Sequence, residues 1–514
     1  MDLHHIFITL FMTFSCLLVV EVNCKSESYK RKDVIVVGGG IAGMAAARRL
    51  LKEGNIAVKV LEARTDRYGG RIWTYREAAT RVRGVDVEVG AGLLNTKAKS
   101  NSLIKMAEEF ELDTESSGSL QVHFVDKNGE KKVYFGDNVT DLYTEVFKIV
   151  IKALRSAQEA GVDRPVNEVL LEALELTYNT EKDQKYDQST IEHVIRSLPV
   201  TVLQNFSSAL YKIENDFGWD KTVIDGMGAL LDRIVAGSGM ELPIKVELNK
   251  VVRNIKMDRE RKKVLIRTLD RKQIVADAVI VALPVGVLKS ENVIFEPPLP
   301  TEKKRALTDV GIGYSSKVVI GFDEAFWPKD VGTFNVFSEV ASNGFLQIWN
   351  NAYRLSGNPF LIGNIFGEEA KLWETKPEEL KKLVKLVLGE LFGAETIKAH
   401  EIKTFIHSNW STDEFILGSV SYPRIGNSPD LWKDLQKPVC PYIFFAGSYT
   451  ETVSHVDNLH GAYNSGVRAA EQYISGICRK TKDPKKKDKK KQNKDEKNNK
   501  KKKDSKDKQR KDEL

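Results

Sequence analysis

The chain has 514 residues, of which 42% are hydrophobic and 29% are charged, and its formal net charge is +7. These values suit a soluble globular protein with a large core and two or more domains, and they exclude a chain that is disordered throughout. The charge is uneven, because residues 479–514 hold 19 Lys and Arg against 8 Asp and Glu, a net +11 that leaves −4 for the remainder.

The first predicted element is a signal peptide. Residues 6–20 form the only long apolar stretch, which is too short for a comfortable membrane span, and a tolerable cleavage site ends at Cys24. We therefore predict a signal peptide over residues 1–24 and no stable membrane span. A signal anchor is the alternative, because His4 and His5 stand where basic residues are usual.

A nucleotide-binding turn follows. The sequence DVIVVGGGIAG places Gly38, Gly40 and Gly43 after an apolar run and at the start of a predicted helix over residues 42–52. In such a turn the first glycine permits the bend, the second lets a pyrophosphate approach the helix N-terminus, and the third allows close packing. Glu62 ends the next apolar run, where a carboxylate can accept hydrogen bonds from ribose hydroxyls and disfavours NADP. The pattern predicts a dinucleotide, NAD or FAD, rather than a turn without a ligand.

A second glycine-rich turn, Gly69-Gly70-Arg71, lies in the sequence EARTDRYGGRIWT. Glycines let the backbone approach a phosphate, and a guanidinium suits bidentate phosphate contact. Standing alone, the triplet would equally suit a surface turn. Directly after Glu62, it makes the chain resemble the flavin amine oxidase family, which includes monoamine, polyamine, spermine and L-amino-acid oxidases and histone demethylases.

Three later segments carry the same resemblance, which runs from about residue 32 to 477 and is closest to the polyamine and spermine oxidase branch. They are residues 249–289, with NKVVRNI and ADAVIVALPVGVLK; residues 313–328, GYSSKVVIGFDEAFWP; and residues 444–471, FFAGSYTETVSHVDNLHGAYNSGVRAAE. The resemblance implies that FAD is bound non-covalently, since the AGSYTE segment has no counterpart of the cysteine that links the flavin in monoamine oxidases.

The resemblance also assigns site residues. Lys317, in YSSKVVIGF, matches the active-site lysine that in the family holds a water against the flavin, and burial without a carboxylate would lower its pKa. Strand alternation permits Lys317 to face either way, so its orientation rests on the family match. The residues implied to bind FAD are Gly38, Gly40, Gly43, Glu62, Arg64, Gly70, Arg71, Val252, Trp410, Gly447, Ser448 and Leu459.

Four positions on the substrate and flavin side bear on specificity. Asn95 stands where polyamine oxidases place an acid or histidine near the substrate nitrogen, and Asn458 stands where the family has an aromatic wall. Phe415 could supply a remaining wall of an amine cage, which works by cation–π attraction. Ser448 replaces a glutamate that usually holds the ribityl chain. The departures at Asn95 and Asn458 concern polyamine specificity and not FAD binding.

The C-terminal segment, residues 479–514, is rich in lysine, has no apolar residue before Leu514 and ends in KDEL. Its composition predicts disorder, either as a solvated stalk or as an electrostatic tether. KDEL is an address for the endoplasmic reticulum, so we expect the protein in the lumen and the KDEL receptor as a partner. No nucleic acid is expected, because no aromatic residues lie among the basic ones.

In the lumen, sequons can be glycosylated and cysteines can form disulfides. Asn138 and Asn205 begin plausible glycosylation sequons, whereas we expect Asn409, in a third sequon, to be buried. Cys440 and Cys478 would remain after removal of the signal peptide and could pair in an oxidising lumen, although two cysteines make no disulfide framework. Neither cysteine has a metal-ligand spacing, and no metal site is expected.

The predicted fold is α/β (α+β), a Rossmann-like FAD-binding domain built from discontinuous segments plus a mixed-sheet substrate domain. The first comprises residues 33–95, 225–300 and 430–478, and the second comprises residues 96–224, mostly helical with helices over 141–160 and 189–213, and residues 301–429. The predicted function is FAD-dependent oxidation of a polyamine-like amine to an imine and then an aldehyde, with O2 reduced to H2O2. The alternatives are an L-amino-acid oxidase, which needs an arginine facing the substrate carboxylate, and a flavin-binding protein without amine turnover.

Overall fold

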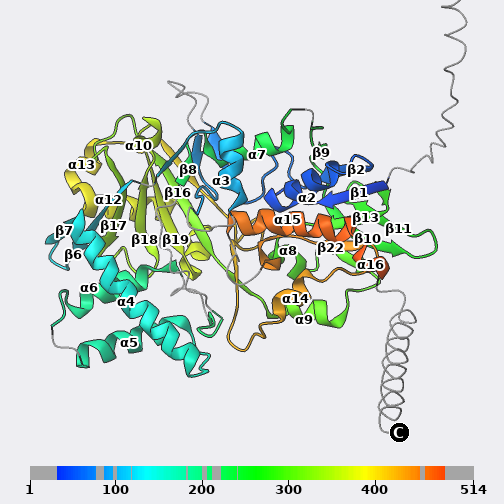
Figure 1. Cartoon of the computed structure of the whole chain (residues 1–514). Helices are drawn as coiled ribbons and strands as arrows, with labels where there is room; N and C mark the ends of the chain where they lie inside the picture. Colours follow the sequence, from blue (N-terminus) through cyan, green and yellow to red (C-terminus); the bar gives the residue numbers. More distant parts are fainter. Residues whose placement is uncertain are drawn as a thin grey trace, which may run out of the picture.

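Two large sheets, one parallel and one mixed, organise the molecule and stand in its two halves (Figure 1). The computed structural model describes residues 32–76, 86–95, 101–116, 118–180, 183–199, 205–210, 221–239, 241–451 and 458–480. The predicted signal peptide and residues 481–514 of the lysine-rich tail, with the KDEL sequence, therefore lie outside the described residues.

The first sheet has five parallel strands in the order β22-β13-β1-β2-β9. Its strands are β1 (Lys32–Val37), β2 (Ile56–Leu61), β9 (Val246–Glu247), β13 (Ala278–Val281) and β22 (Ile443–Phe445). The run VIVV of β1 is buried on both faces, as is usual for a central parallel strand. The strand order reverses direction beside β1, and ligands of open α/β sheets bind at such a point, beyond the carboxyl ends of the strands.

This sheet is the middle one of three layers. Val34 and Val36 pack with helices on one face, whereas Ile35 and Val37 pack with a smaller sheet and helices on the other. Figure 1 shows α15 running beside α2. The first set of helices is α2 (Ile41–Leu51), α3 (Ser102–Glu109), α7 (Gly226–Ala236) and α15 (Leu459–Ile474). The second set comprises β10 (Val252–Asp258), β11 (Lys263–Thr268), β12 (Gln273–Ala276) and β14 (Ile294–Glu296), with α8 (Val285–Lys289), α9 (Thr301–Asp309) and α14 (Leu431–Gln436).

The second large sheet has seven strands in the order β20-β16-β19-β18-β17-β6-β7, in which only the β17–β6 pair is parallel. Its strands are β6 (Ser119–Val125), β7 (Lys131–Phe135), β16 (Ser315–Gly321), β17 (Val331–Phe337), β18 (Phe345–Asn351), β19 (Phe360–Phe366) and β20 (Thr404–His407). Val318 and Ile320 pack toward α12 (Pro377–Phe392), whereas Val319 packs with Val87 and Val89 on the opposite face. Lys317 shares that opposite face with Val319, because strand side chains alternate.

Helices cover the β6–β7 end of this sheet, at the lower left of Figure 1. They are α4 (Asp137–Glu159), α5 (Val166–Thr180) and α6 (Gln188–Ser197). The predicted helix over residues 189–213 was too long, because the chain is extended at Leu198, as the residue before a proline tends to be. Residues 96–224 are also less helical than predicted, since β6 and β7 join the mixed sheet and the short strands β5 (Thr114–Ser116) and β8 (Lys221–Val223) pair with each other.

The remaining elements are short. These are the strand pairs β3 (Thr74–Arg76) with β4 (Asp86–Glu88) and β15 (Gly311–Gly313) with β21 (Val420–Tyr422), and the helices α10 (Tyr353–Ser356), α11 (Glu368–Trp373), α13 (Ala394–Ala399), η2 (Ser448–Thr450) and α16 (Ile477–Lys480). Within the described ranges, no helix combines the length and apolar character needed to cross a membrane.

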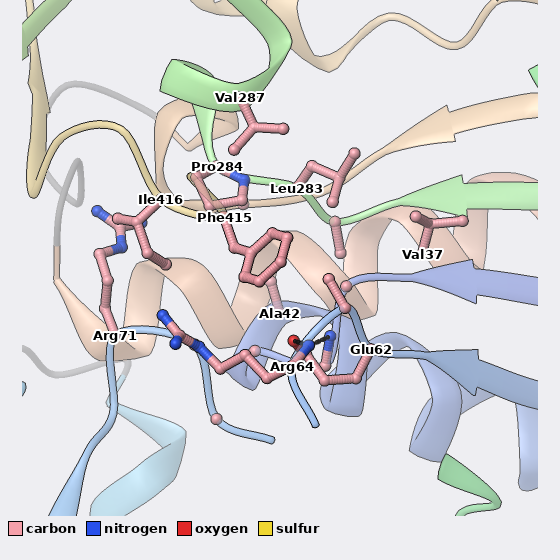
Figure 2. Close-up of a pocket in the computed structure, with 18 of the residues that line it drawn as sticks. Val37, Ala42, Glu62, Arg64, Arg71, Leu283, Pro284, Val287, Phe415 and Ile416 are labelled. Carbon is pink, nitrogen blue, oxygen red and sulfur yellow. Dashed lines mark hydrogen bonds between the residues drawn. The ribbon is translucent and has the colours of Figure 1, made fainter. Parts of the chain in front are cut away.

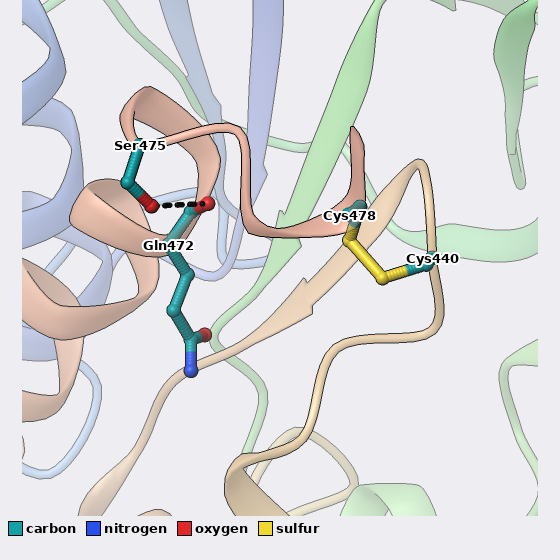
Figure 3. Close-up of a disulfide and its surroundings, with 4 residues drawn as sticks. All are labelled: Cys440, Gln472, Ser475 and Cys478. Atoms are coloured by element: carbon teal, nitrogen blue, oxygen red, sulfur yellow. Dashed lines mark hydrogen bonds between the residues drawn. A yellow bond between two sulfur atoms is a disulfide. The ribbon is translucent and has the colours of Figure 1, made fainter. Parts of the chain in front are cut away.

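A disulfide between Cys440 and Cys478 ties the loop before β22 to the segment after α15 (Figure 3). The two elements that it connects both lead to the cavity described below. The sequon residues Asn138, Asn205 and Asn409 are all exposed. The expectation that Asn409 is buried was therefore wrong, because only the next side chain, Trp410, turns into the protein.

Candidate active site

The first glycine turn follows β1 and has the geometry of a nucleotide-binding turn. Gly38 has a φ of 105°, and a Cβ on it would lie 2.5 Å from Ala282 O. A Cβ on Gly43 would lie 2.0 Å from Gly38 O, so helix α2 can pack here only through a glycine. In contrast, a Cβ on Gly40 would meet nothing closer than Gly69 O at 3.9 Å. Gly40, the N-cap of α2, therefore leaves open space at a helix N-terminus, where a phosphate is favoured.

Glu62 fixes this turn to the end of β2. Its Oε2 accepts from Gly39 N at 2.8 Å and its Oε1 accepts from Arg64 N at 2.9 Å, and the residue is 6% exposed. A carboxylate has about four lone-pair sites, so these two bonds leave capacity for the hydroxyls of a ribose. Glu62 thus has the position and the chemistry that its spacing predicted.

A large cavity opens beyond the carboxyl ends of β1, β2, β13 and β22 (Figure 2). It is lined by residues from these strand ends and from both glycine-rich turns, an arrangement that suits a bound dinucleotide. The predicted FAD-binding residues that line it are Gly38, Gly40, Glu62, Arg64, Gly70, Arg71, Val252, Gly447, Ser448 and Leu459. Of the predicted substrate residues, Phe415 and Asn458 also line it.

The second glycine-rich turn lies against the first. Gly69 N donates to Gly39 O at 2.8 Å. Arg71 donates from Nη2 to Ser448 Oγ at 3.1 Å and from Nη1 to Ser419 O, which places its guanidinium between two distant segments. Arg67, which the sequence did not single out, donates from Nη1 to Gly70 O at 3.0 Å. Burial, with the neighbouring charge of Arg64, lowers the pKa of Arg67 to about 10. Arg64 and Arg71 line the cavity and could contact a diphosphate, whereas Arg67 holds the carbonyl groups of the second glycine-rich turn.

The end of β22 and the start of α15 supply another wall of the cavity. Gly447, at the end of β22, has a φ of 132° and its N donates to Ser465 Oγ at 2.9 Å. Asn458 is the N-cap of α15, and both Asn458 and Leu459 line the cavity. A second helix N-terminus thus faces the ligand space. The turn after β13, with Leu283 and Pro284, also lines it, although no residue there was assigned from sequence (Figure 2).

Lys317 lies on β16 and points toward the segment that leads to this cavity. Its Nζ donates to Gly90 O at 2.6 Å, and its backbone N donates to Ser408 Oγ at 2.8 Å. Burial lowers the pKa of Lys317, and the Glu88 carboxylate offsets part of this effect. Ala91, one residue after Gly90, lines the cavity. Of the two faces that strand alternation allowed, Lys317 therefore has the inner one, although the residue itself is not part of the cavity lining.

Three other predicted residues lie outside the lining. Gly43 serves helix packing. The Trp410 ring packs edge to face with Trp73 at 6.1 Å between centroids, behind the cavity wall. Asn95 accepts through its backbone O from Asn101 Nδ2 at 2.8 Å, where Asn101 caps α3. The next residues, 96–100, lie outside the described ranges.

Comparison with known proteins identifies the family. The profile of the flavin containing amine oxidoreductases matches residues 41–474. The chain belongs to this family. A relative of Arabidopsis thaliana, lysine-specific histone demethylase 1 homolog 2, is 30% identical over 86% of this chain and 58% of its own length. Polyamine oxidase 2 of Arabidopsis thaliana is 27% identical over 88% of this chain and 90% of its own length.

Solved structures agree on the fold. Wild-type putrescine oxidase bound to putrescine superimposes on this chain with a TM-score of 0.65 at 24% sequence identity. The superposition covers 86% of this chain and 99% of the putrescine oxidase chain. The predicted fold class, with an FAD-binding domain and a substrate domain, is therefore confirmed. As a member of the flavin containing amine oxidoreductases, the protein is an FAD-dependent amine oxidase.

The cavity fits FAD, and the binding is non-covalent. Gly38, Gly40 and Gly43 would shape the turn that receives the pyrophosphate, Glu62 would bind the ribose, and Arg71 would supply positive charge for the diphosphate. No cysteine is among the lining residues, and the two cysteines in the described ranges are bonded to each other. When bound, FAD supplies the redox chemistry by accepting a hydride equivalent from an amine.

Proposed function

We propose that the protein oxidises a polyamine-like amine in the lumen of the endoplasmic reticulum. The carbon next to the nitrogen loses a hydride equivalent to FAD and the nitrogen loses a proton, which leaves an imine. Water then hydrolyses the imine to an aldehyde and a smaller amine. Two electrons and two protons pass to O2, which becomes H2O2. L-amino-acid oxidation remains the alternative reaction.

Lys317 carries this proposal. It is the one predicted catalytic residue, and its Nζ bonds to Gly90 O beside the cavity wall. Because burial lowers the pKa of Lys317, a larger fraction of its side-chain amino group is neutral than in an exposed lysine. A neutral amine can accept a proton from water or hold a water in place. Lys317 would therefore manage a proton at the edge of the site while the backbone of Gly90 keeps it oriented.

The substrate class rests on the cavity and on the relatives. Phe415 lines the cavity, and although one face of its ring contacts Arg64, the ring could also contact a substrate ammonium. Polyamine oxidases and a putrescine oxidase are among the proteins that this chain resembles. Asn458 is neutral and lines the cavity, at a position where the resemblance places an aromatic wall in the family, and this favours a polar substrate chain over a purely aliphatic one. The histone demethylase relatives leave other secondary amines open.

A second candidate, a flavin-binding protein without amine turnover, has one observation in its favour. Neither Asn458 nor Asn95 can act as a base, so neither side chain can accept the proton of a substrate ammonium. If these replacements ended turnover, FAD binding would persist, since the residues that bind the dinucleotide keep their geometry. The experiment described next separates this candidate from the active amine oxidase.

That experiment is anaerobic mixing of the purified FAD-loaded protein with a panel of monoamines, diamines, triamines, tetraamines and L-amino acids. Loss of flavin absorbance with at least one polyamine, followed by peroxide release on admission of oxygen, is the expected result. Bleaching by L-amino acids alone would replace the proposal with the amino-acid oxidase. A flavin that no compound bleaches would support the protein without turnover.

The lumenal position is supported by a disulfide, which persists in the secretory pathway and is rare in the cytosol, and by exposed sequons at Asn138 and Asn205. We expect the KDEL receptor to retain the protein. Removal of residues 511–514 should send it into the culture medium, with its N-terminus processed and its sequons glycosylated. Continued retention of that truncated protein would contradict the role of KDEL.

A further inference from the structure

An ion pair joins two walls of the FAD cavity. Arg64 Nη2 bonds to Asp413 Oδ2, between residues that are 349 positions apart in the chain. Arg64 follows β2 and lines the cavity. Asp413 belongs to the turn, residues 409–417, that carries the lining residue Phe415. The two side chains are 16% and 10% exposed, so the pair is largely withdrawn from water.

Asp413 is held firmly on its side. Its backbone N donates to Asn409 O at 2.9 Å, and its Oδ1 accepts from Phe415 N at 2.9 Å. Glu374 also holds this turn, because its Oε2 accepts a hydrogen bond from Ser411 N at 2.9 Å. The carboxylate of Asp413 is therefore presented to Arg64 by a turn that has little freedom to move.

Arg64 is fixed at its base and reaches outward. Its backbone N bonds to Glu62 Oε1, and its guanidinium carbon lies 5.9 Å from the centroid of the Phe415 ring. Figure 2 shows the Arg64 side chain extending from beside Glu62 across the cavity and below Phe415. The ion pair and the cation–π contact thus connect the dinucleotide-binding wall to the opposite turn.

We propose that Arg64 and Asp413 form a clasp that holds these walls together around FAD and slows its release. A non-covalent cofactor stays bound only while its walls stay closed, and removing one partner of a buried ion pair leaves the other charge uncompensated, which destabilises the closed arrangement. Asp413 is not part of the cavity lining, so it acts through Arg64 as a positioning residue. The inference rests on FAD binding, which the proposed function also needs.

The test begins with Asp413→Asn, which keeps the shape of the side chain and an oxygen for Phe415 N but removes the charge. The matched control is Asp430→Asn, which removes an exposed ion pair with Lys433 away from the cavity. Release of FAD after dilution is followed by the rise in free-flavin fluorescence. We expect about tenfold faster release for Asp413→Asn and an unchanged rate for the control. Equal release from wild type and Asp413→Asn would overturn the clasp.

Two further measurements separate a clasp from a general structural role. In wild type, release should become faster as salt is added, and this salt dependence should shrink in Asp413→Asn. In a double-mutant cycle with Arg64→Gln, the double variant should release FAD no faster than the worse single variant. Additive effects would overturn the clasp, and Asp413→Ser, which also removes the charge and keeps an oxygen for Phe415 N, takes the place of Asp413→Asn if that variant does not fold. A wild-type protein that binds no FAD at all would instead contradict the proposed function itself.

Discussion

Lys317 Nζ donates to Gly90 O at 2.6 Å, and this bond joins the mixed sheet to the wall of the FAD cavity. Gly90 lies tightly against the second glycine-rich turn, since a Cβ on it would lie 2.2 Å from Arg71 O. Its neighbour Ala91 lines the cavity. Lys317 is thus placed at the junction of the two halves of the molecule, where substrate and cofactor would meet.

Replacing Lys317 by Met should leave FAD content near normal, because the side chain is not part of the cavity lining and Met preserves length and apolar packing. Flavin reduction by amine, or its reoxidation by oxygen, should fall by about 10²–10⁴-fold, the usual effect of losing a positioned proton-handling group. Stopped-flow absorbance measures both half-reactions. Lys385→Met, on the exposed face of α12, is the control and should behave as wild type. Unchanged rates in both half-reactions for Lys317→Met would remove Lys317 from the mechanism.

Local chemistry made much of the fold and site predictable. Gly38, Gly40 and Gly43 act within one strand-turn-helix, so their spacing alone indicates their roles. Glu62 is predictable because it ends the neighbouring parallel strand. β6 was missed because its sequence SLQVHFV mixes polar and apolar residues, and its place in the sheet comes from pairing with β17, more than 200 residues later in the chain.

Contacts between distant segments were not predictable from one sequence. In the sequence, Arg67 is one of several charged residues in a loop. Only the fold brings its guanidinium to the backbone carbonyls of the second glycine-rich turn. Asp413 sits beside Phe415 in the sequence, but its partner Arg64 is 349 positions away. Lys317 needed a family resemblance to choose its face, because alternation defines two faces and not which one is inward.

Gly40→Val should give a folded protein without flavin. Gly40 has ordinary extended dihedral angles, with φ −76° and ψ 174°, and its Cβ would enter open space, so valine is compatible with the backbone but occupies the position of the pyrophosphate. Flavin absorbance after purification and circular dichroism measure the two properties. Gly43→Val is the contrasting variant, because its Cβ would clash with Gly38 O and should impair folding as well. A Gly40→Val protein with full yellow absorbance would contradict the assignment of this turn to FAD.

Lys303, on α9, should make stability depend on pH. It is 3% exposed, its Nζ donates to Leu435 O at 2.6 Å, and burial, with the charge of Arg468, lowers its pKa to about 7. In the unfolded chain its pKa is about 10.4, so between these values the unfolded state binds more protons and stability rises with pH. Below the folded pKa, both states are protonated and the cost of burying the charge is constant.

The measurement is urea unfolding of wild type and Lys303→Met at several pH values from 7 to 10. Other groups titrate equally in both proteins, so the difference isolates Lys303. Wild type should gain stability relative to Lys303→Met as the pH rises through this range. A constant difference would mean that Lys303 keeps its proton in the folded state.

The Cys440–Cys478 disulfide should stabilise the fold and the cofactor site together. Because it closes a loop with a sequence separation of 38, the chain-entropy relation predicts a loss of about 4 kcal/mol when it is removed. The single variants Cys440→Ser and Cys478→Ser and the double variant should lose the same amount, since each opens the same loop. The loop contains Gly447 and Leu459, so FAD should also leave these variants at lower urea concentrations than it leaves wild type. Unfolding followed by flavin fluorescence and by circular dichroism reports both effects. Wild type treated with a reductant should then match the variants. If the reductant frees the thiols of wild type but leaves its unfolding midpoint unchanged, the disulfide is dispensable to the fold.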